Sequence, residues 1–172
     1  REIYYSQHST GGGAVQDALT HIINAGQWLV GPIDSLAADA AHLVLPGVSV
    51  EDTVHVLTRQ GNVLGSYSLN QHQAANEVTI TVTCENGMVR FEHHRTRWRW
   101  LVEPDGEWHD QPFDSLPRDA LFVQQADSFL DAVSHRGSVA CSLDEATHTL
   151  QANLAILAAA ESRSWQTLGR TD

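Results

Sequence analysis

An acid, an imidazole and an amide follow one another on a short segment with helical periodicity. In the stretch "GGGAVQDALTHIINAGQWLVG", Asp17, His21 and Asn24 are separated by four and then three residues. At about 100° per residue, these positions project within about 60° of one another on a helix. A carboxylate at that distance can hydrogen-bond an imidazole, fix its tautomer and favour its protonated form. We therefore predict that Asp17 and His21 form a pair suited to proton transfer, with Asn24 beside them.

The three glycines that precede this segment, Gly11 to Gly13, bear on the same question. Without side chains they would let another backbone or a ligand approach the start of the helix closely. The alternative interpretation is an ordinary helix N-terminus with polar surface residues, in which Asp17 simply favours the helix dipole. Short polar patterns recur freely, so the spacing by itself names no reaction.

The elements that would position these residues are a helix and a block of strands. The helix spans residues 14–29, and its apolar face consists of Val15, Leu19, Ile22, Ile23 and Leu29. The strands fall between about residues 36 and 112, and residues 44–50 within this range form a loop. The strands at 52–59 and 63–70 are joined by Gln60-Gly61-Asn62 as a hairpin. The strand at 76–84 is followed by Asn86-Gly87, the preferred residue pair of a type I′ hairpin turn. Pro104-Asp105-Gly106 forms the turn of a further strand pair. Consecutive hairpins of this kind predict a mainly antiparallel sheet.

Two more helices close the predicted order. One spans residues 118–135, with Gly137 suited to its C-terminal cap and an apolar face of Leu121, Phe122, Phe129, Leu130 and Val133. The other spans 142–161 and opens with a capping box from Ser142 to Glu145; its apolar stripe is Ala146, Leu150, Leu154 and Leu157. Strands in one run with helices at its ends predict an α+β fold, in which an open antiparallel sheet carries the helices on one face.

Composition restricts the class of protein. The 172 residues carry a net charge of −11, which disfavours partners such as nucleic acid or an anionic membrane. All ten basic residues are Arg, so a mechanism that needs a lysine cannot be completed by this chain alone. Two cysteines, Cys84 and Cys141, make no disulfide framework and favour a cytoplasmic setting. The chain opens on a predicted strand at residues 3–5 without an initiator Met, and we expect a piece of a longer protein.

Two further patterns suggest other functions. The stretch "EHHRTRWRWLVE", residues 92–103, interleaves basic and aromatic side chains, as single-stranded nucleic-acid sites do. Strand alternation would instead send one set to one face, His93, Arg95, Arg97 and Arg99, and the other set to the opposite face, His94, Thr96, Trp98 and Trp100. The acidic net charge favours that structural interpretation. Ten histidines also raise the question of a metal. No dense cluster of Cys, His and Asp accompanies them, so we predict no metal site.

The order of these motifs resembles the C-terminal domain of the Gfo/Idh/MocA oxidoreductases, the family of glucose–fructose oxidoreductase and inositol dehydrogenase. Members show three glycines, an Asp, a His four residues later and then Trp-Leu, which here are Gly11 to Gly13, Asp17, His21 and Trp28-Leu29. The resemblance extends through "VEDTVHVLTRQGNVLGSYSLN", "NEVTITVTCENGMVRFE" and "CSLDEATHTLQANLAILAAAESRSWQTL". It covers nearly the whole chain, and it is carried by the order of the motifs rather than by any one of them.

The resemblance implies that residues 1–172 are a single substrate-binding and oligomerisation domain, the second half of an enzyme whose NAD- or NADP-binding Rossmann half and catalytic Lys lie elsewhere. His21 would exchange the proton of a substrate hydroxyl while hydride passes to or from the cofactor, and Asp17 would bind substrate or orient the pair. The substrate would be a sugar, cyclitol or related polyol. The chain alone would be neither active nor able to bind the cofactor.

Other residues enter through the same resemblance. Asn24 stands where many members have Asp; it could contact a substrate hydroxyl but could not act as a base. His72 lies in a loop that approaches the cleft in the family, and Tyr5, Gln7 and His8 precede the glycines, so these are candidate substrate contacts. The sheet face opposite the helices pairs subunits in the family, which predicts a homodimer or larger. The alternative is a non-catalytic sugar-binding or oligomerisation module with a degenerate site.

Overall fold

The computed structural model describes residues 5–169 of the chain. The chain divides into two compact units, the first formed by Arg1–His72 with Cys141–Asp172 and the second by Gln73–Ala140. Each unit contains its own four-stranded antiparallel sheet, which confirms the α+β class. The single block of strands expected between residues 36 and 112 is therefore wrong in one respect, because the strands belong to two sheets. That the two units act as one domain stays a prediction.

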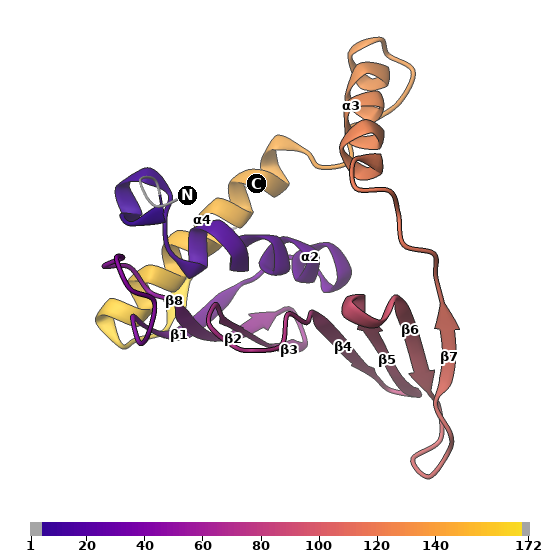
Figure 1. The fold of residues 1–172 in the computed structure, drawn as a ribbon, viewed down its shortest axis with the longest axis horizontal. Helices are drawn as coiled ribbons and strands as arrows, with labels where there is room; N and C mark the ends of the chain where they lie inside the picture. The colour runs from indigo at the N-terminus through magenta and orange to yellow at the C-terminus, as the bar shows by residue number, and fades with distance from the viewer. Residues whose placement is uncertain (1–4, 170–172) are drawn as a thin grey trace. The chain divides into compact units, whose positions relative to one another are not determined.

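The first unit is a sheet covered on one face by two helices (Figure 1). The sheet has the order β3-β2-β1-β8. Its strands are β1 (Ser35–Ala41), β2 (Thr53–Gln60), β3 (Val63–Asn70) and the short β8 (Gln166–Thr167). The helices are α2 (Thr20–Val30), which the π-helical turn η2 (Val15–Leu19) precedes, and α4 (Leu143–Ser162). The predicted helix over 14–29 and the strand pair 52–59 and 63–70 are thus confirmed, whereas Tyr5, the one described residue of the strand predicted at 3–5, is helical.

Alternation along β2 shows which face of this sheet packs against the helices. Val54 and Val56 are buried and join the core, whereas His55 and Leu57, the residues that follow each of them, are exposed. The core itself is formed by the buried faces of both helices and the inward residues of β1 and β2: Ala14, Val15, Leu19, Ile23, Ile33, Leu36, Val54, Val56, Ala152, Ile156, Ala159 and Leu168. One face of the sheet is therefore covered by helices and the other is open.

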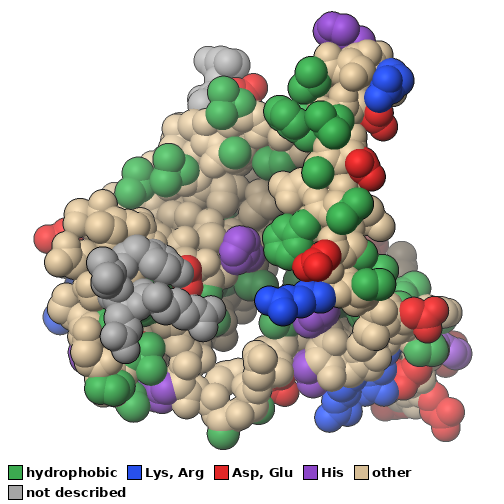
Figure 2. All heavy atoms as spheres, turned by 45° about the horizontal axis from the view of Figure 1, so that its top comes forward, with side chains coloured by type: hydrophobic (Ala, Val, Ile, Leu, Met, Phe, Trp, Pro, Cys, Tyr) green, Lys and Arg blue, Asp and Glu red, His purple; other side chains and the backbone are tan. Residues whose placement is uncertain are grey.

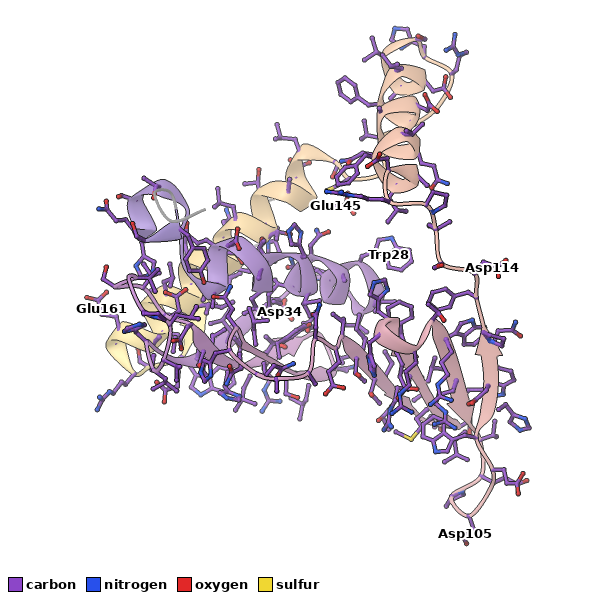
Figure 3. The ribbon with its side chains drawn as sticks, in the orientation of Figure 1. Trp28, Asp34, Asp105, Asp114, Glu145 and Glu161 are labelled. Atoms are coloured by element: carbon purple, nitrogen blue, oxygen red, sulfur yellow. The ribbon has the colours of Figure 1, made fainter. Side chains whose placement is uncertain are left out.

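Helix α4 begins as predicted but presents a different face to the core. Its capping box forms, with the amide N of Glu145 3.2 Å from Ser142 Oγ and the amide N of Ser142 2.7 Å from the Glu145 carboxylate. Figure 3 labels Glu145 and Glu161 near its two ends. The predicted stripe is wrong at Leu150 and Leu154, which are 55% and 53% exposed, whereas its last residue, Leu157, packs against the core. The buried face carries small and polar residues instead: His148, Thr149, Ala152, Asn153, Ile156 and Ala159.

Hydrogen bonds explain the rotation of α4. Thr149 Oγ1 lies 3.1 Å from Asn24 Nδ2 and 3.0 Å from Gln27 Nε2, and both amides donate to it from α2. Asn153 Nδ2 donates to Thr20 Oγ1 over 2.8 Å. Burying a polar group is costly unless it is hydrogen-bonded. These bonds give partners to Thr149 and to the Asn153 amide nitrogen along the contact between α2 and α4, whereas Asn153 Oδ1 is buried without a partner among the described residues. Small Ala residues on the same face permit close packing of the two helices.

The second unit is built on a sheet of order β4-β5-β6-β7. Its strands are β4 (Thr79–Cys84), β5 (Gly87–Glu92), β6 (Arg97–Leu101) and β7 (His109–Pro112). Cys84 pairs with Gly87, so Glu85 and Asn86 are the central residues of the turn. Neither has a positive φ, whereas Gly87 has a φ of 146°. The turn predicted as type I′ at Asn86-Gly87 is therefore wrong, because that type needs positive φ at both central residues.

The basic and aromatic stretch divides between the two faces of this sheet, as the alternation predicts. Arg97 bonds Glu92 and Asp110 at 2.6 Å each, and Arg99 reaches Asp110 at 2.8 Å. Phe91 and Trp98 are register partners on the opposite face. The hydrogen bond from Arg97 and the guanidinium charge lower the pKa of Glu92. The residues before the strand do not alternate, since His93–Arg95 form a 3-10 turn.

Helix α3 (Ala120–Val133) belongs to the second unit, and that it covers the sheet together with the other helices stays a prediction. No residue of α3 is buried. Hydrophobic side chains lie at the surface along it (Figure 2), and Phe122 is 70% exposed. His135, with a φ of 57°, takes the left-handed position after the helix that was predicted for Gly137. Among residues 5–169, no helix is long and apolar enough to cross a membrane.

Candidate active site

The glycine turn owes its conformation to two positive φ angles and one close contact. Gly11 has a φ of 82° and Gly13 a φ of 101°, values that L-residues adopt at a cost. A Cβ on Gly11 would meet only Gln16 Oε1, at 3.9 Å, whereas a Cβ on Gly13 would stand 2.5 Å from Glu51 Oε1. The close approach predicted for these glycines is thus made by the chain's own Glu51 carboxylate, which lies against the start of the helix.

Glu51 is the residue on which this turn is built. It is 6% exposed, and its Oε1 accepts the amide N–H of Val15 over 2.9 Å. Its other oxygen lies 2.5 Å from Nε2 of His8, whose side chain is 49% exposed. The backbone oxygen of Glu51 accepts the amide of Ala14 over 2.9 Å. A carboxylate at a helix start satisfies free amides and interacts favourably with the dipole.

Asp17 lies inside the π-helical turn that follows, and His21 lies one turn further on in α2. The amide of Asp17 donates to the oxygen of Gly13 over 3.0 Å. Asp17 is partly buried, whereas His21 is exposed. That the Asp17 carboxylate pairs with the His21 ring stays a prediction. Single π turns within helices are frequent at functional sites.

Asn24 projects away from the other two residues of the predicted stripe. Its side-chain amide donates to Thr149 of α4 over 3.1 Å, which places it in the contact between the two helices. The structure therefore brings Asp17 and His21 to successive turns and gives Asn24 a packing partner. A substrate contact by Asn24 stays a prediction.

Tyr5 joins the residues around Glu51. Its hydroxyl donates to Gln71 Oε1, at the end of β3. Burial raises the pKa of Tyr5 to about 12, and the negative charges of Glu51, Asp17 and Asp52 act in the same direction against the bond to Gln71. Of the predicted site residues, His8 contacts Glu51 directly, and Asp17 follows the turn that Glu51 holds.

His72 follows Gln71 at the same end of the sheet. Its amide donates to Asn70 Oδ1 over 3.0 Å. Its ring atom Nε2 is buried and has no hydrogen-bond partner within the described part of the chain. A buried polar atom without a partner is uncommon in folded proteins. Its role in binding substrate stays a prediction.

Asp52 fixes the loop that carries Glu51. It is fully buried, and its carboxylate accepts amides of the 42–50 loop, from Leu43 over 3.1 Å, Val44 over 2.7 Å and Leu45 over 2.8 Å. Burial alone would raise the pKa of Asp52, but these amides and the Thr53 hydroxyl outweigh it and hold the pKa well below its usual range. Its backbone oxygen accepts the amide of Gln71 over 2.9 Å. The strand ends that carry Glu51 and Gln71 are therefore tied together.

Sequence reasoning missed Glu51, Asp52 and Gln71. The signal available was two acids, Glu51-Asp52, placed directly before a strand, which is an unusual place for two buried carboxylates. No sequence pattern links Glu51 to the glycines 38 residues earlier, because the contact depends on how the sheet and helix pack. Within residues 5–169, no group of three or more His, Cys, Asp or Glu side chains is arranged to hold a metal ion.

The family model of the GFO/IDH/MocA C-terminal domain matches residues 1–90. A levoglucosan dehydrogenase in complex with NADH and levoglucosan is similar in structure, with a TM-score of 0.84 and 20% identity over 96% of this chain and 53% of that one. The WlbA dehydrogenase of Bordetella pertussis in complex with NADH and UDP-GlcNAcA is also similar, with a TM-score of 0.73 and 21% identity over 98% of this chain and 51% of that one.

An oxidoreductase domain protein from Kribbella flavida is also similar, with a TM-score of 0.78 and 18% identity over 93% of this chain and 51% of that one. At these identities the likeness shows the fold alone. The chain spans about half the length of these proteins. No curated protein matches the sequence.

Proposed function

Because this chain belongs to the GFO/IDH/MocA C-terminal domain family, we propose that it is the substrate-binding half of an NAD- or NADP-dependent oxidoreductase. The substrate is a sugar, cyclitol or related polyol, oxidised at a hydroxyl or reduced at a carbonyl. The observation that carries the proposal is the glycine turn held by the Glu51 carboxylate, after which Asp17 lies in a π-helical turn and exposed His21 lies one turn further on. The sugar-bound dehydrogenases of similar fold support the substrate class.

The cofactor does not fit the one glycine-rich turn that this chain offers. A dinucleotide pyrophosphate binds at a helix N-terminus, where free amides and the dipole attract negative charge. Here the carboxylate of Glu51 already accepts the Val15 amide at that position, and it would repel a phosphate. The cofactor therefore belongs to the other half of the intact protein, and its nicotinamide supplies the hydride chemistry.

The residues of this chain would handle the substrate and its proton. Imidazole gains and loses a proton near neutral pH, so His21 takes the hydroxyl proton during oxidation and returns it during reduction. Asp17 accepts a hydrogen bond from a substrate hydroxyl and places the reacting carbon. Tyr5, His8, His72 and Asn24 are the remaining substrate contacts that we propose, and a cytoplasmic location accords with the dehydrogenase chemistry.

A second copy of the protein is the partner that we propose for the second unit. The apolar face of its sheet carries Ile80, Val82, Val89, Phe91, Trp98 and Trp100 in register. Trp98 and Val89 are each 39% exposed. An exposed apolar face commonly marks an interaction surface, and two-fold homodimers are the commonest oligomers.

A non-catalytic module is the second candidate, and the bond of the Asn24 amide to Thr149, within the contact between two helices, favours it. The test is cofactor reduction by the intact protein, followed at 340 nm with NAD or NADP and a panel of levoglucosan, L-sorbose and cyclitols. The proposal predicts turnover with at least one polyol. Sugar binding without turnover of any of them, seen by calorimetry, would instead support the module.

A further inference from the structure

Glu51 has an arrangement that ordinary packing does not require. A buried carboxylate is costly unless its oxygens are hydrogen-bonded, and here both oxygens have partners. Val15 donates to one over 2.9 Å, and Nε2 of His8 lies 2.5 Å from the other. No Arg is among these partners. The carboxylate thus joins two segments, the one before the glycines and the helix start after them.

The glycine turn is shaped to receive this carboxylate. Gly13 lacks the Cβ that would stand 2.5 Å from Glu51 Oε1, and the Glu51 backbone oxygen holds the next amide, that of Ala14, at 2.9 Å. Three successive residues, Gly13 to Val15, therefore lie against Glu51. The turn cannot shift along the helix axis without breaking one of these contacts.

Asp17 is attached directly to the turn that Glu51 holds. Its amide donates to the oxygen of Gly13 over 3.0 Å, and it lies two residues beyond Val15 in the same π-helical turn. Glu51 and Asp17 thus contact the same residue, since Gly13, whose oxygen accepts the Asp17 amide, is also the glycine packed against Glu51 Oε1. A displacement of the turn would therefore move Asp17 with respect to whatever binds there.

We propose that Glu51 is a positioning residue, which fixes the glycine turn through Val15, Ala14 and Gly13 and thereby sets the place of the Asp17 carboxylate. The part of this proposal that concerns catalysis rests on the proposed function above. Glu51 itself touches no reacting atom. Its removal acts through Asp17, so it lowers the rate of the chemical step rather than the stability alone. Misplacement by about 1 Å can reduce a rate by about 100-fold.

The test compares Glu51→Ala and Glu51→Gln in the intact oxidoreductase with a core variant, Ile156→Val, as the control. Ile156 is fully buried in α4, so its variant lowers the melting temperature without touching the turn. We expect Glu51→Ala to lower kcat by about 10- to 100-fold with less change in KM, because Asp17 would be misplaced with respect to the substrate. Glu51→Gln keeps an oxygen that can accept the Val15 amide, and it should recover most of kcat.

The Ile156→Val control shows how much kcat falls through lost stability alone. A Glu51→Ala protein whose kcat stays within about twofold of that control would overturn the proposal. So would a Glu51→Gln variant as slow as Glu51→Ala. These results concern Glu51 only if the wild-type protein turns over a polyol.

A second measurement separates failure of this inference from failure of the proposed function. Amide hydrogen exchange of Val15 and Asp17, followed by NMR in the present chain, needs no substrate. We expect Glu51→Ala to raise the exchange rates of both amides by at least about 10-fold relative to Ile156→Val, because exchange reports local opening of the structure. Faster exchange would support the positioning role even if no polyol is a substrate. Unchanged exchange would overturn it whatever the enzyme does.

Discussion

Substituting alanine at two neighbouring glycines isolates the contact on which the site depends. Gly11 and Gly13 both have positive φ, 82° and 101°, so each alanine variant carries a backbone cost of roughly 1–2 kcal/mol. The gain from a less flexible unfolded chain is common to both variants. Only Gly13→Ala places its Cβ 2.5 Å from Glu51 Oε1, whereas Gly11→Ala meets nothing closer than 3.9 Å.

The difference between the two variants therefore measures the close approach of Glu51. Overpacking of a buried site costs roughly 1–3 kcal/mol, so Gly13→Ala should be less stable than Gly11→Ala by about that amount. In the Glu51→Ala background the contact no longer exists, and the two glycine variants should then cost about the same. This non-additivity is expected only for residues in direct contact.

Urea unfolding of this chain, followed by far-UV circular dichroism at 25 °C, gives the free energies of unfolding for the wild type, both single variants and their combinations with Glu51→Ala. The m-value should stay constant if only the folded state changes. Equal destabilisation by Gly11→Ala and Gly13→Ala, to within about 0.5 kcal/mol, would refute the close packing of Glu51 against the turn.

Three further outcomes are expected. The pKa of Asp52 is depressed in the folded chain, so the stabilisation by this carboxylate is complete above the unfolded pKa of about 3.9 and is lost as the pH falls below that value. Asp52→Asn should lower the melting temperature at pH 7 and flatten the decline of the melting temperature between pH 5 and 3. A decline parallel to that of the wild type would contradict this. Light scattering should give a mass above the 18.9 kDa of one chain. Replacing Trp98 and Trp100 by Ser should reduce that mass, whereas the control Trp28→Ser on α2 should not. A monomeric mass for the wild type would rule out the proposed dimer. Calorimetric titration of the chain with NAD or NADP should show no micromolar binding, since Glu51 occupies the helix start at the glycine turn; measurable affinity would show that the cofactor site is here.

Local patterns in the sequence predict most of the first unit's elements. The hairpin of β2 and β3, its turn at Gly61 and the Ser142 capping box depend on neighbours in the sequence, and the structure has them as predicted. The face of α4 could not be found in this way. Leu150 and Leu154 define the more hydrophobic stripe, but the polar partners of Thr149 lie on another helix more than 120 residues away.

The candidate site shows the same limit. The residue types and spacing of Asp17 and His21 can be read directly from the chain, and the resemblance gives them roles. Glu51 could not be found, because its link to Val15 and His8 joins residues 36 and 43 positions apart. Nor does α-helical spacing anticipate the π turn of Val15–Leu19, which changes how Asp17 is presented with respect to His21.

The central claim is that His21 exchanges the substrate proton in an oxidoreductase of which this chain is one half. Its most direct test is the single-turnover rate of cofactor reduction in the intact protein, measured by stopped flow at 340 nm with a saturating polyol for the wild type and His21→Ala. The account predicts a loss of roughly 10²–10⁴-fold in that rate, the usual contribution of a positioned acid or base. Hydride transfer in His21→Ala at the wild-type rate would contradict it.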